Sequence, residues 1–135
     1  IYIMDMASSH AVNATRHPAR DEGPVWSPDG SRMAFISDRD GTSKVYVMDL
    51  DAAVPAAVGP APIRRGIPRW SPDGKWLAYV TGTPPSAKIH LTDLRDGSHR
   101  EVAATAFDLA DLQWISEGTG RVASGWHRFS TVRLE

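Results

Sequence analysis

The sequence contains no cysteine, so disulfide bonds, thiolate catalysis and cysteine-ligated zinc are excluded. It also has no apolar run approaching the length of about 18 residues that suggests a membrane-spanning helix. Fifteen basic against sixteen acidic residues leave a net charge of -1, without the basic excess that nucleic acid or an anionic membrane surface requires. The densest basic cluster, Arg64-Arg65 with Arg69 close behind, is too small for that purpose. We therefore expect no nucleic-acid partner and no membrane span.

Patterns that carry catalysis or bind metals are missing as well. The five histidines have neither His-x-x-x-His nor His-Glu-x-x-His spacing, and no Gly-x-Ser-x-Gly elbow or glycine-rich phosphate loop occurs. These histidines are His10, His17, His90, His99 and His127. The segment Asp38-Arg39-Asp40-Gly41 lacks the further oxygen ligands of a calcium loop, which favours a solvated hairpin loop. The sequence thus predicts no catalytic residue, no metal site and no cofactor.

The sequence does contain an internal repeat. Trp26, Trp70 and Trp114 follow one another at intervals of 44 residues. A second series keeps the same interval, because Ile1-Tyr2-Ile3-Met4-Asp5-Met6 recurs at 45–50 and again at 89–94. Two independent markers with one period make coincidence very improbable. A period of about 40–45 residues with strand patterning is typical of a β-propeller blade.

Local patterns inside the repeat agree with an all-β fold. Asp29-Gly30 and Asp73-Gly74 end two copies of a Trp-Ser-Pro-Asp-Gly segment, in which glycine accepts the positive φ of a tight turn. Each turn precedes a β-prone run, at 32–37 and at 76–81, and an alternating strand follows. No segment has a convincing helical period with caps. We predict blades of four antiparallel strands in one domain, 1–135, with repeats at approximately 1–44, 45–88 and 89–132.

These motifs resemble the WD-type repeat of TolB-like propellers. Pro-x-Trp-Ser-Pro-Asp-Gly, an aromatic-aliphatic strand, Ser-Asp-Arg-Asp-Gly and Val-Tyr-Val-Met-Asp carry the resemblance over nearly the whole chain. The third copy is degraded, since Trp114-Ile115-Ser116-Glu117-Gly118 replaces Trp-Ser-Pro-Asp-Gly. Similar blades occur in periplasmic accessory proteins and in prolyl-oligopeptidase-like and tricorn-like peptidases. The resemblance implies a ring of six blades and a periplasmic or other extracytoplasmic location, while a cytoplasmic location stays open.

Three blades do not close a ring, because propellers use about 4–8 blades. Two interpretations are physically sensible: two copies form a six-bladed homodimer, or the chain lacks blades that belong to a longer protein. The N-terminal segment is also expected to supply outer strands that complete the last blade. Because the chain opens at Ile1 inside a strand-like run, we expect a processed product or a piece of a longer protein.

Residues that recur from one repeat to another are expected to be structural, since a catalytic residue would be unique to one blade. This group contains Trp26, Asp29, Gly30, Trp70, Asp73, Gly74 and Trp114. Binding specificity is expected where the copies diverge, in the connections that enter each innermost strand at one mouth of the channel. The candidate binding residues there are Arg20, Asp21, Arg64, Arg65, Arg69, Asp108 and Asp111.

The arginines of this set favour a carboxylate or an acidic peptide, because a guanidinium donates in a planar, bidentate fork. The function predicted from the sequence is a noncatalytic binding or scaffold module for a protein or peptide partner. Two alternatives stay open: the propeller part of a larger enzyme such as a peptidase, and a self-assembling structural repeat without a ligand.

Overall fold

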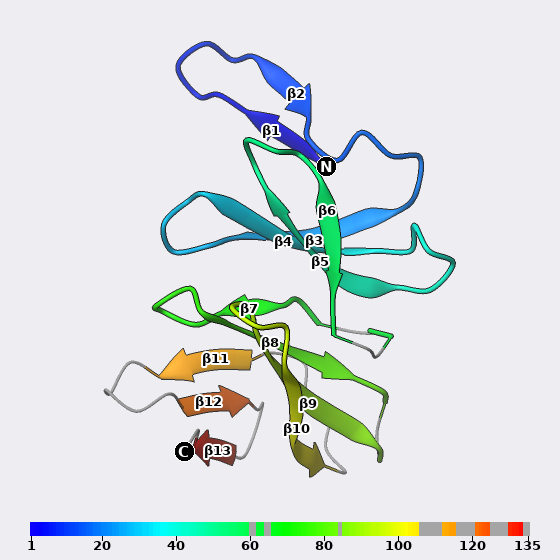
Figure 1. Ribbon diagram of the computed structural model, residues 1–135, viewed down its shortest axis with the longest axis vertical. Helices are drawn as coiled ribbons and strands as arrows, with labels where there is room; N and C mark the ends of the chain where they lie inside the picture. The colour runs from blue at the N-terminus through cyan, green and yellow to red at the C-terminus, as the bar shows by residue number, and fades with distance from the viewer. Residues whose placement is uncertain are drawn as a thin grey trace.

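The protein is described here from a computed structural model, which defines residues 1–59, 62–63, 66–83, 85–105, 112–115, 121–124 and 130–133. The described residues form only strands, turns and loops, arranged as four antiparallel sheets. Figure 1 shows the N-terminal hairpin at one end of the long axis and the C-terminal strands at the other. The expected all-β fold with antiparallel blades is confirmed.

Two sheets are complete four-stranded blades. The first blade consists of β3 (Asp21–Trp26), β4 (Arg32–Ser37), β5 (Lys44–Asp49) and β6 (Pro55–Val58), paired in that order. The second blade consists of β7 (Arg69–Trp70), β8 (Trp76–Thr81), β9 (Ala87–Asp93) and β10 (His99–Thr105), also paired in chain order.

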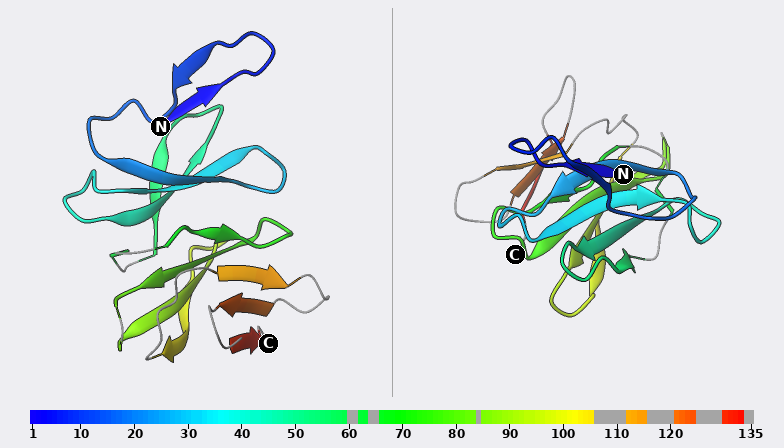
Figure 2. Two further views of the ribbon diagram at one scale, coloured as in Figure 1. Left: turned by 180° about the vertical axis from the view of Figure 1, so that it is seen from behind. Right: turned by 90° about the horizontal axis from the view of Figure 1, so that it is seen from above.

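Two smaller sheets flank these blades. The N-terminal hairpin pairs β1 (Tyr2–Met4) with β2 (Ala11–Asn13). The C-terminal sheet pairs β11 (Leu112–Ile115), β12 (Arg121–Ser124) and β13 (Ser130–Arg133). The hairpin and the C-terminal sheet lie at opposite ends of the molecule, as Figure 2 shows from behind. The expectation that the N-terminal segment completes the last blade is therefore wrong within a single chain, because the two intervening blades keep these sheets apart.

Apolar side chains between adjacent sheets form the core. The middle strands β4 and β8 are buried on both faces, since each blade has a neighbouring sheet on either side. Met33, Phe35, Tyr46 and Met48 form the cluster on the hairpin side of the first blade. A second cluster joins the two blades, and a third joins the second blade to the C-terminal sheet.

Tryptophan side chains link each blade to the one before it. The Trp70 Nε1–H donates to the Val25 carbonyl at 3.1 Å, and the Trp114 Nε1–H donates to the Arg69 carbonyl at 3.1 Å. The Arg32 guanidinium lies 4.8 Å from the Trp70 ring centroid, a cation–π distance. The repeat period therefore sets one indole-to-carbonyl bond at each of these junctions.

The Trp-Ser-Pro-Asp-Gly segments form the β3–β4 and β7–β8 turns. In the first turn, Ser27 Oγ donates to Asp29 Oδ1 at 2.6 Å and accepts from the Arg32 backbone N–H at 2.9 Å. The second turn repeats both bonds with Ser71, Asp73 and Trp76. Hydrogen bonds from Ser27 and from the backbone and hydroxyl of Ser31 lower the pKa of Asp29 to about 2.

A close contact joins the outer strand of the first blade to the second blade. Gly59 has a φ of +76°, and a Cβ built on it would lie 1.7 Å from the Tyr79 hydroxyl oxygen. Tyr79 is fully buried and stacks on His90, with ring centroids 5.6 Å apart. Burial lowers the pKa of His90. Because the Tyr79 side chain is fully buried, a Cβ at position 59 would force packed atoms to shift, and glycine avoids this.

We expect Gly59→Ala to lower the free energy of unfolding by about 2–5 kcal/mol, from backbone strain plus overpacking against Tyr79. The matched control is Gly97→Ala, at a φ of +74° with nothing within 4 Å of its Cβ. This control carries the strain alone and is expected to cost about 1–2 kcal/mol. Urea unfolding monitored by tryptophan fluorescence measures both, and equal losses would contradict the steric assignment.

The depressed pKa of Asp29 makes the first turn sensitive to acid. The native carboxylate stabilises the fold fully above the ordinary aspartate pKa of 3.8, and this contribution is lost as the pH falls towards the lowered pKa of about 2. Asp29→Asn removes the charge and keeps an acceptor oxygen. We expect the difference in Tm between the wild type and Asp29→Asn to shrink between these pH values. Asp51→Asn, in the exposed β5–β6 turn, is the control; a difference for Asp29→Asn that stays constant with pH would rule out the linkage.

Candidate functional site

A pocket of roughly 690 Å³ lies at one end of the junction between the two complete blades. Four segments form it: the entry to β3, the β4–β5 loop, the β6–β7 connection and the β8–β9 loop. Antiparallel pairing places these segments at the same end of the two sheets. The lining residues are Arg20, Glu22, Ile36, Gly41, Thr42, Ser43, Pro62, Ile63, Gly66 and Thr83.

The charged lining residues come from the entry to β3. Arg20 Nη2 lies 2.7 Å from Glu22 Oε2, and both side chains are largely exposed. Such a surface ion pair contributes about 0–1 kcal/mol, so Arg20 can exchange it for another carboxylate at little cost. The backbone N–H of Arg20 donates to Asp38 Oδ1 at 3.0 Å, which fixes the strand entry against the β4–β5 loop.

The floor of the pocket is apolar and the rim is polar. Ile36 and Ile63 are buried, whereas Thr42 and the Thr83 loop reach the surface. The Ile63 N–H donates to the Ser43 carbonyl at 2.8 Å, so the β6–β7 connection is held against the β4–β5 loop. The pocket walls are therefore joined by hydrogen bonds in the absence of any ligand.

Asp21 points away from this pocket and supports the β4–β5 loop from the other face of the blade. It forms an ion pair with Arg39 at 3.0 Å, and both side chains are nearly buried. Burial opposes its ionisation, but hydrogen bonds from Ser37, Thr15 and Arg39 prevail and lower the pKa of Asp21. The ion pair between Asp21 and Arg39 therefore has a structural role, because removing one partner would leave the other as an unpaired buried charge.

Two aromatic rings hold the Arg39 guanidinium. Its Cζ lies 5.1 Å from the Phe35 centroid and 4.9 Å from the Tyr46 centroid. The Tyr46 hydroxyl donates to Asp40 Oδ2 at 2.5 Å, and burial together with this bond raises the pKa of Tyr46 to about 12. These contacts fix the start of the β4–β5 loop, whose later residues Gly41, Thr42 and Ser43 line the pocket.

The structure distributes the candidate binding residues over several places. Arg20 lines the pocket, whereas Asp21 faces Arg39. Arg69 Nε donates to the Leu112 carbonyl at 3.0 Å and so connects the second blade to the C-terminal sheet. The remaining four, Arg64, Arg65, Asp108 and Asp111, lie outside the described residues.

Sequence reasoning missed the contribution of the loops that precede the third strand of each blade. Thr42, Ser43 and Thr83 belong to these loops and line the pocket. In an antiparallel blade, the loop between the second and third strands lies at the same end as the entry to the first strand. That connectivity was available from the sequence and would have pointed to these residues.

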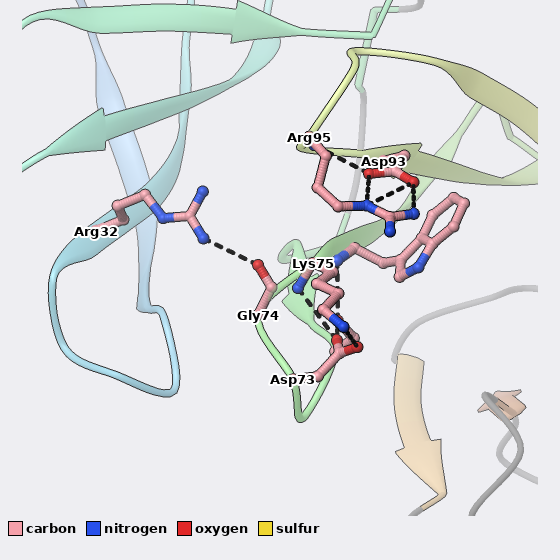
Figure 3. A network of polar contacts seen from close by, with 8 residues as sticks. Arg32, Asp73, Gly74, Lys75, Asp93 and Arg95 are labelled. Atoms are coloured by element: carbon pink, nitrogen blue, oxygen red, sulfur yellow. Dashed lines mark hydrogen bonds and ion pairs between the residues drawn. The ribbon is translucent and has the colours of Figure 1, made fainter.

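The opposite end of the junction carries a separate polar network, drawn in Figure 3. Arg32 Nη2 donates to the Gly74 carbonyl at 2.9 Å, which ties the two β-turns together. Asp93 accepts from the side chain and backbone of Arg95, which lowers the pKa of Asp93 to about 2. Within the described part of the chain, no three histidine or acidic side chains gather as a metal site, and no helix could span a membrane.

Comparison with known proteins identifies a family with this architecture. Residues 1–110 match the family model described as the TolB beta propeller domain. No curated protein matches the chain in a sequence search.

Several solved structures share the fold. TolB from Acinetobacter baumannii is 18% identical with a TM-score of 0.72, over 98% of this chain and 36% of that one. A puromycin-hydrolysing peptidase of Mycobacterium tuberculosis is 22% identical with a TM-score of 0.74, over 98% of this chain and 24% of that one. An oligogalacturonate lyase in complex with manganese is 13% identical with a TM-score of 0.72, over 99% and 41%.

These identities show the fold alone, and the chain spans less than half the length of each of these proteins. The match to the family model is different in kind, because it covers most of the chain and includes both complete blades. The chain therefore belongs to the TolB β-propeller domain family.

Proposed function

We propose that this chain is a noncatalytic binding module that holds a peptide segment of a protein partner in the pocket between its two complete blades. The observation that carries the proposal is the pocket itself. Its volume of roughly 690 Å³ falls in the range of about 300–1,000 Å³ that is usual for ligand sites. An apolar floor with a polar rim suits a peptide, which presents apolar side chains and amide groups together.

The charge of the partner follows from the arginines. The Arg20 side chain is exposed at the rim of the pocket. Its ion pair with Glu22 is a surface pair, which a carboxylate of the ligand can replace at little cost in free energy. In the sequence, Arg64 and Arg65 stand between Ile63 and Gly66, both of which line the pocket. This placement favours an acidic peptide, since guanidinium groups pair with carboxylates in a bidentate manner.

A second candidate is the propeller part of a larger enzyme that positions a substrate. The fold shared with the puromycin-hydrolysing peptidase, of which this chain covers 24%, favours it. An open reading frame that continues into a hydrolase domain would distinguish this candidate. For both candidate functions we propose an extracytoplasmic location. Fractionation of cells that express the tagged full-length protein tests this location.

Filling the pocket should block the proposed function. The probe is a short fluorescein-labelled peptide of alternating aspartate and leucine, measured by fluorescence anisotropy. We expect Thr42→Trp to weaken its binding about tenfold or more, which equals about 1.4 kcal/mol. Ala52→Trp is the matched control, because Ala52 is also exposed but lies in the β5–β6 turn at the other end of the blade.

Charge is tested separately with the asparagine version of the same peptide. Wild-type protein should bind it more weakly than the aspartate peptide, and Arg64→Ala with Arg65→Ala should abolish that preference. Equal binding of both peptides would refute the acidic ligand. Failure of Thr42→Trp to weaken the binding of either peptide would refute the pocket as the binding site.

A further inference from the structure

Both complete blades contain a stacked pair of rings at the same repeat position. In the first blade, Phe35 stacks on Tyr46 with ring centroids 5.9 Å apart. In the second blade, Tyr79 and His90 stack with centroids 5.6 Å apart, and each lies 44 residues after its counterpart. In both blades the two rings belong to directly opposite residues of the second and third strands. A histidine in the second blade thus takes the place of a tyrosine in the first.

Only the ring pair of the first blade has charged partners. The Tyr46 hydroxyl donates to Asp40, and the Arg39 guanidinium lies against both rings of the pair. One repeat later the sequence has Thr83 and Pro84 at the two corresponding positions, and neither side chain is charged. The second blade therefore keeps the ring pair but has lost the charged groups that accompany it.

His90 is buried without a hydrogen-bonding partner. Its side chain is 8% exposed, and neither ring nitrogen has a hydrogen-bond partner in the described part of the chain. A protonated imidazole carries two N–H donors and a charge, and burying them without an acceptor costs far more free energy than burying the neutral ring. The closed junction between the two complete blades is therefore compatible with the neutral form of His90 alone.

The ionisable groups around His90 do not change this conclusion. Glu101 lies opposite His90 on β10, but its carboxylate forms an ion pair with Lys88 at 2.9 Å. Burial is the main cause of the lowered pKa of His90; Lys88 and His99 lower it further, and Glu101 opposes them without prevailing. On β8, burial raises the pKa of Tyr79, so its hydroxyl stays neutral.

The ring pair of the second blade supports one wall of the pocket. The Tyr79 hydroxyl packs against Gly59, where the chain leaves β6. Ile63 belongs to the same apolar cluster as Tyr79, and both Pro62 and Ile63 line the pocket. Residues 52–63 contain no ionisable side chain, so this segment of the first blade has nothing to neutralise an imidazolium. Movement of the ring pair would therefore displace the pocket wall.

We propose that His90 makes the junction between the two complete blades open in acid, and that this opening releases a peptide held in the pocket. When the junction opens, the His90 ring reaches water and takes up a proton. The proton is then a ligand of the open form alone, so mass action shifts the equilibrium towards that form as the pH falls. The release rests on the proposed function, whereas the opening is a property of the chain itself.

Unfolding in urea as a function of pH tests the opening. The stability that neutral His90 confers is complete above 6.5, the ordinary pKa of histidine, and is lost as the pH falls towards the lowered native pKa. In this window the unfolding constant of the wild type should rise by up to about tenfold per pH unit relative to His90→Phe, which keeps a ring without a titratable group. His10→Phe, in the exposed β1–β2 loop, should retain the wild-type profile. Parallel pH profiles of the wild type and His90→Phe would overturn the proposal.

Hydrogen exchange of the wild type locates the opening without any variant. The Trp70 indole N–H bonds to Val25 across this junction, and the Trp114 indole N–H bonds to Arg69 across the next one. Protection factors, corrected for the intrinsic pH dependence of exchange, should fall for Trp70 between pH 7.5 and about 5.5 while those for Trp114 stay constant. Unchanged protection of Trp70, or an equal loss at both indoles, would overturn the assignment of the opening to His90.

Calorimetric titration with the unlabelled peptide of alternating aspartate and leucine tests the release. The wild type should bind it about tenfold more weakly at pH 5.5 than at pH 7.5, and His90→Phe should lose most of this difference. The peptide stays ionised at both pH values, because the ordinary pKa of aspartate is about 3.9. Equal wild-type affinity at both values would overturn acid release. Absence of binding at both would contradict the proposed function, and the unfolding and exchange measurements judge the opening without a peptide.

Discussion

One hydrogen bond, from an indole N–H to a backbone carbonyl of the preceding blade, sets the spacing of the sheets. It occurs at Trp70 and again at Trp114, each 45 residues beyond its acceptor. A buried indole N–H without an acceptor would cost about 1–3 kcal/mol, so each blade must approach its neighbour until the bond forms. The aliphatic and aromatic clusters then fill the space that this contact defines.

The pocket follows from that spacing. Its walls belong to two different blades, and the bond between Ser43 and Ile63 joins a loop of the first blade to the connection that leads to the second. On the far face of the first blade, Arg39 is held by Asp21 and two aromatic rings, and it supports the same loop. Packing that stabilises the fold thus also shapes the rim that we propose to bind a peptide.

Much of this could be predicted from the sequence. The 44-residue period, the Asp-Gly turns and the alternating strands depend on local patterns, and these are enough to predict a fold of antiparallel blades. Side-chain contacts between residues distant in sequence were not predictable. The ion pair of Asp21 with Arg39 and the hydrogen bond from Arg69 to the Leu112 carbonyl depend on which face of the sheet each side chain lies on. The pairing of β13 with β12 was not predictable for another reason, since the degraded third copy offers no turn motif from which to count.

The apolar clusters of the described residues join adjacent sheets, so the coupling between these sheets resembles that of a one-dimensional array. The junction between the first and second blades has a complete four-stranded sheet on both sides. The peptide pocket lies at that middle junction. A ligand that bridges both blades would therefore couple their two unfolding equilibria.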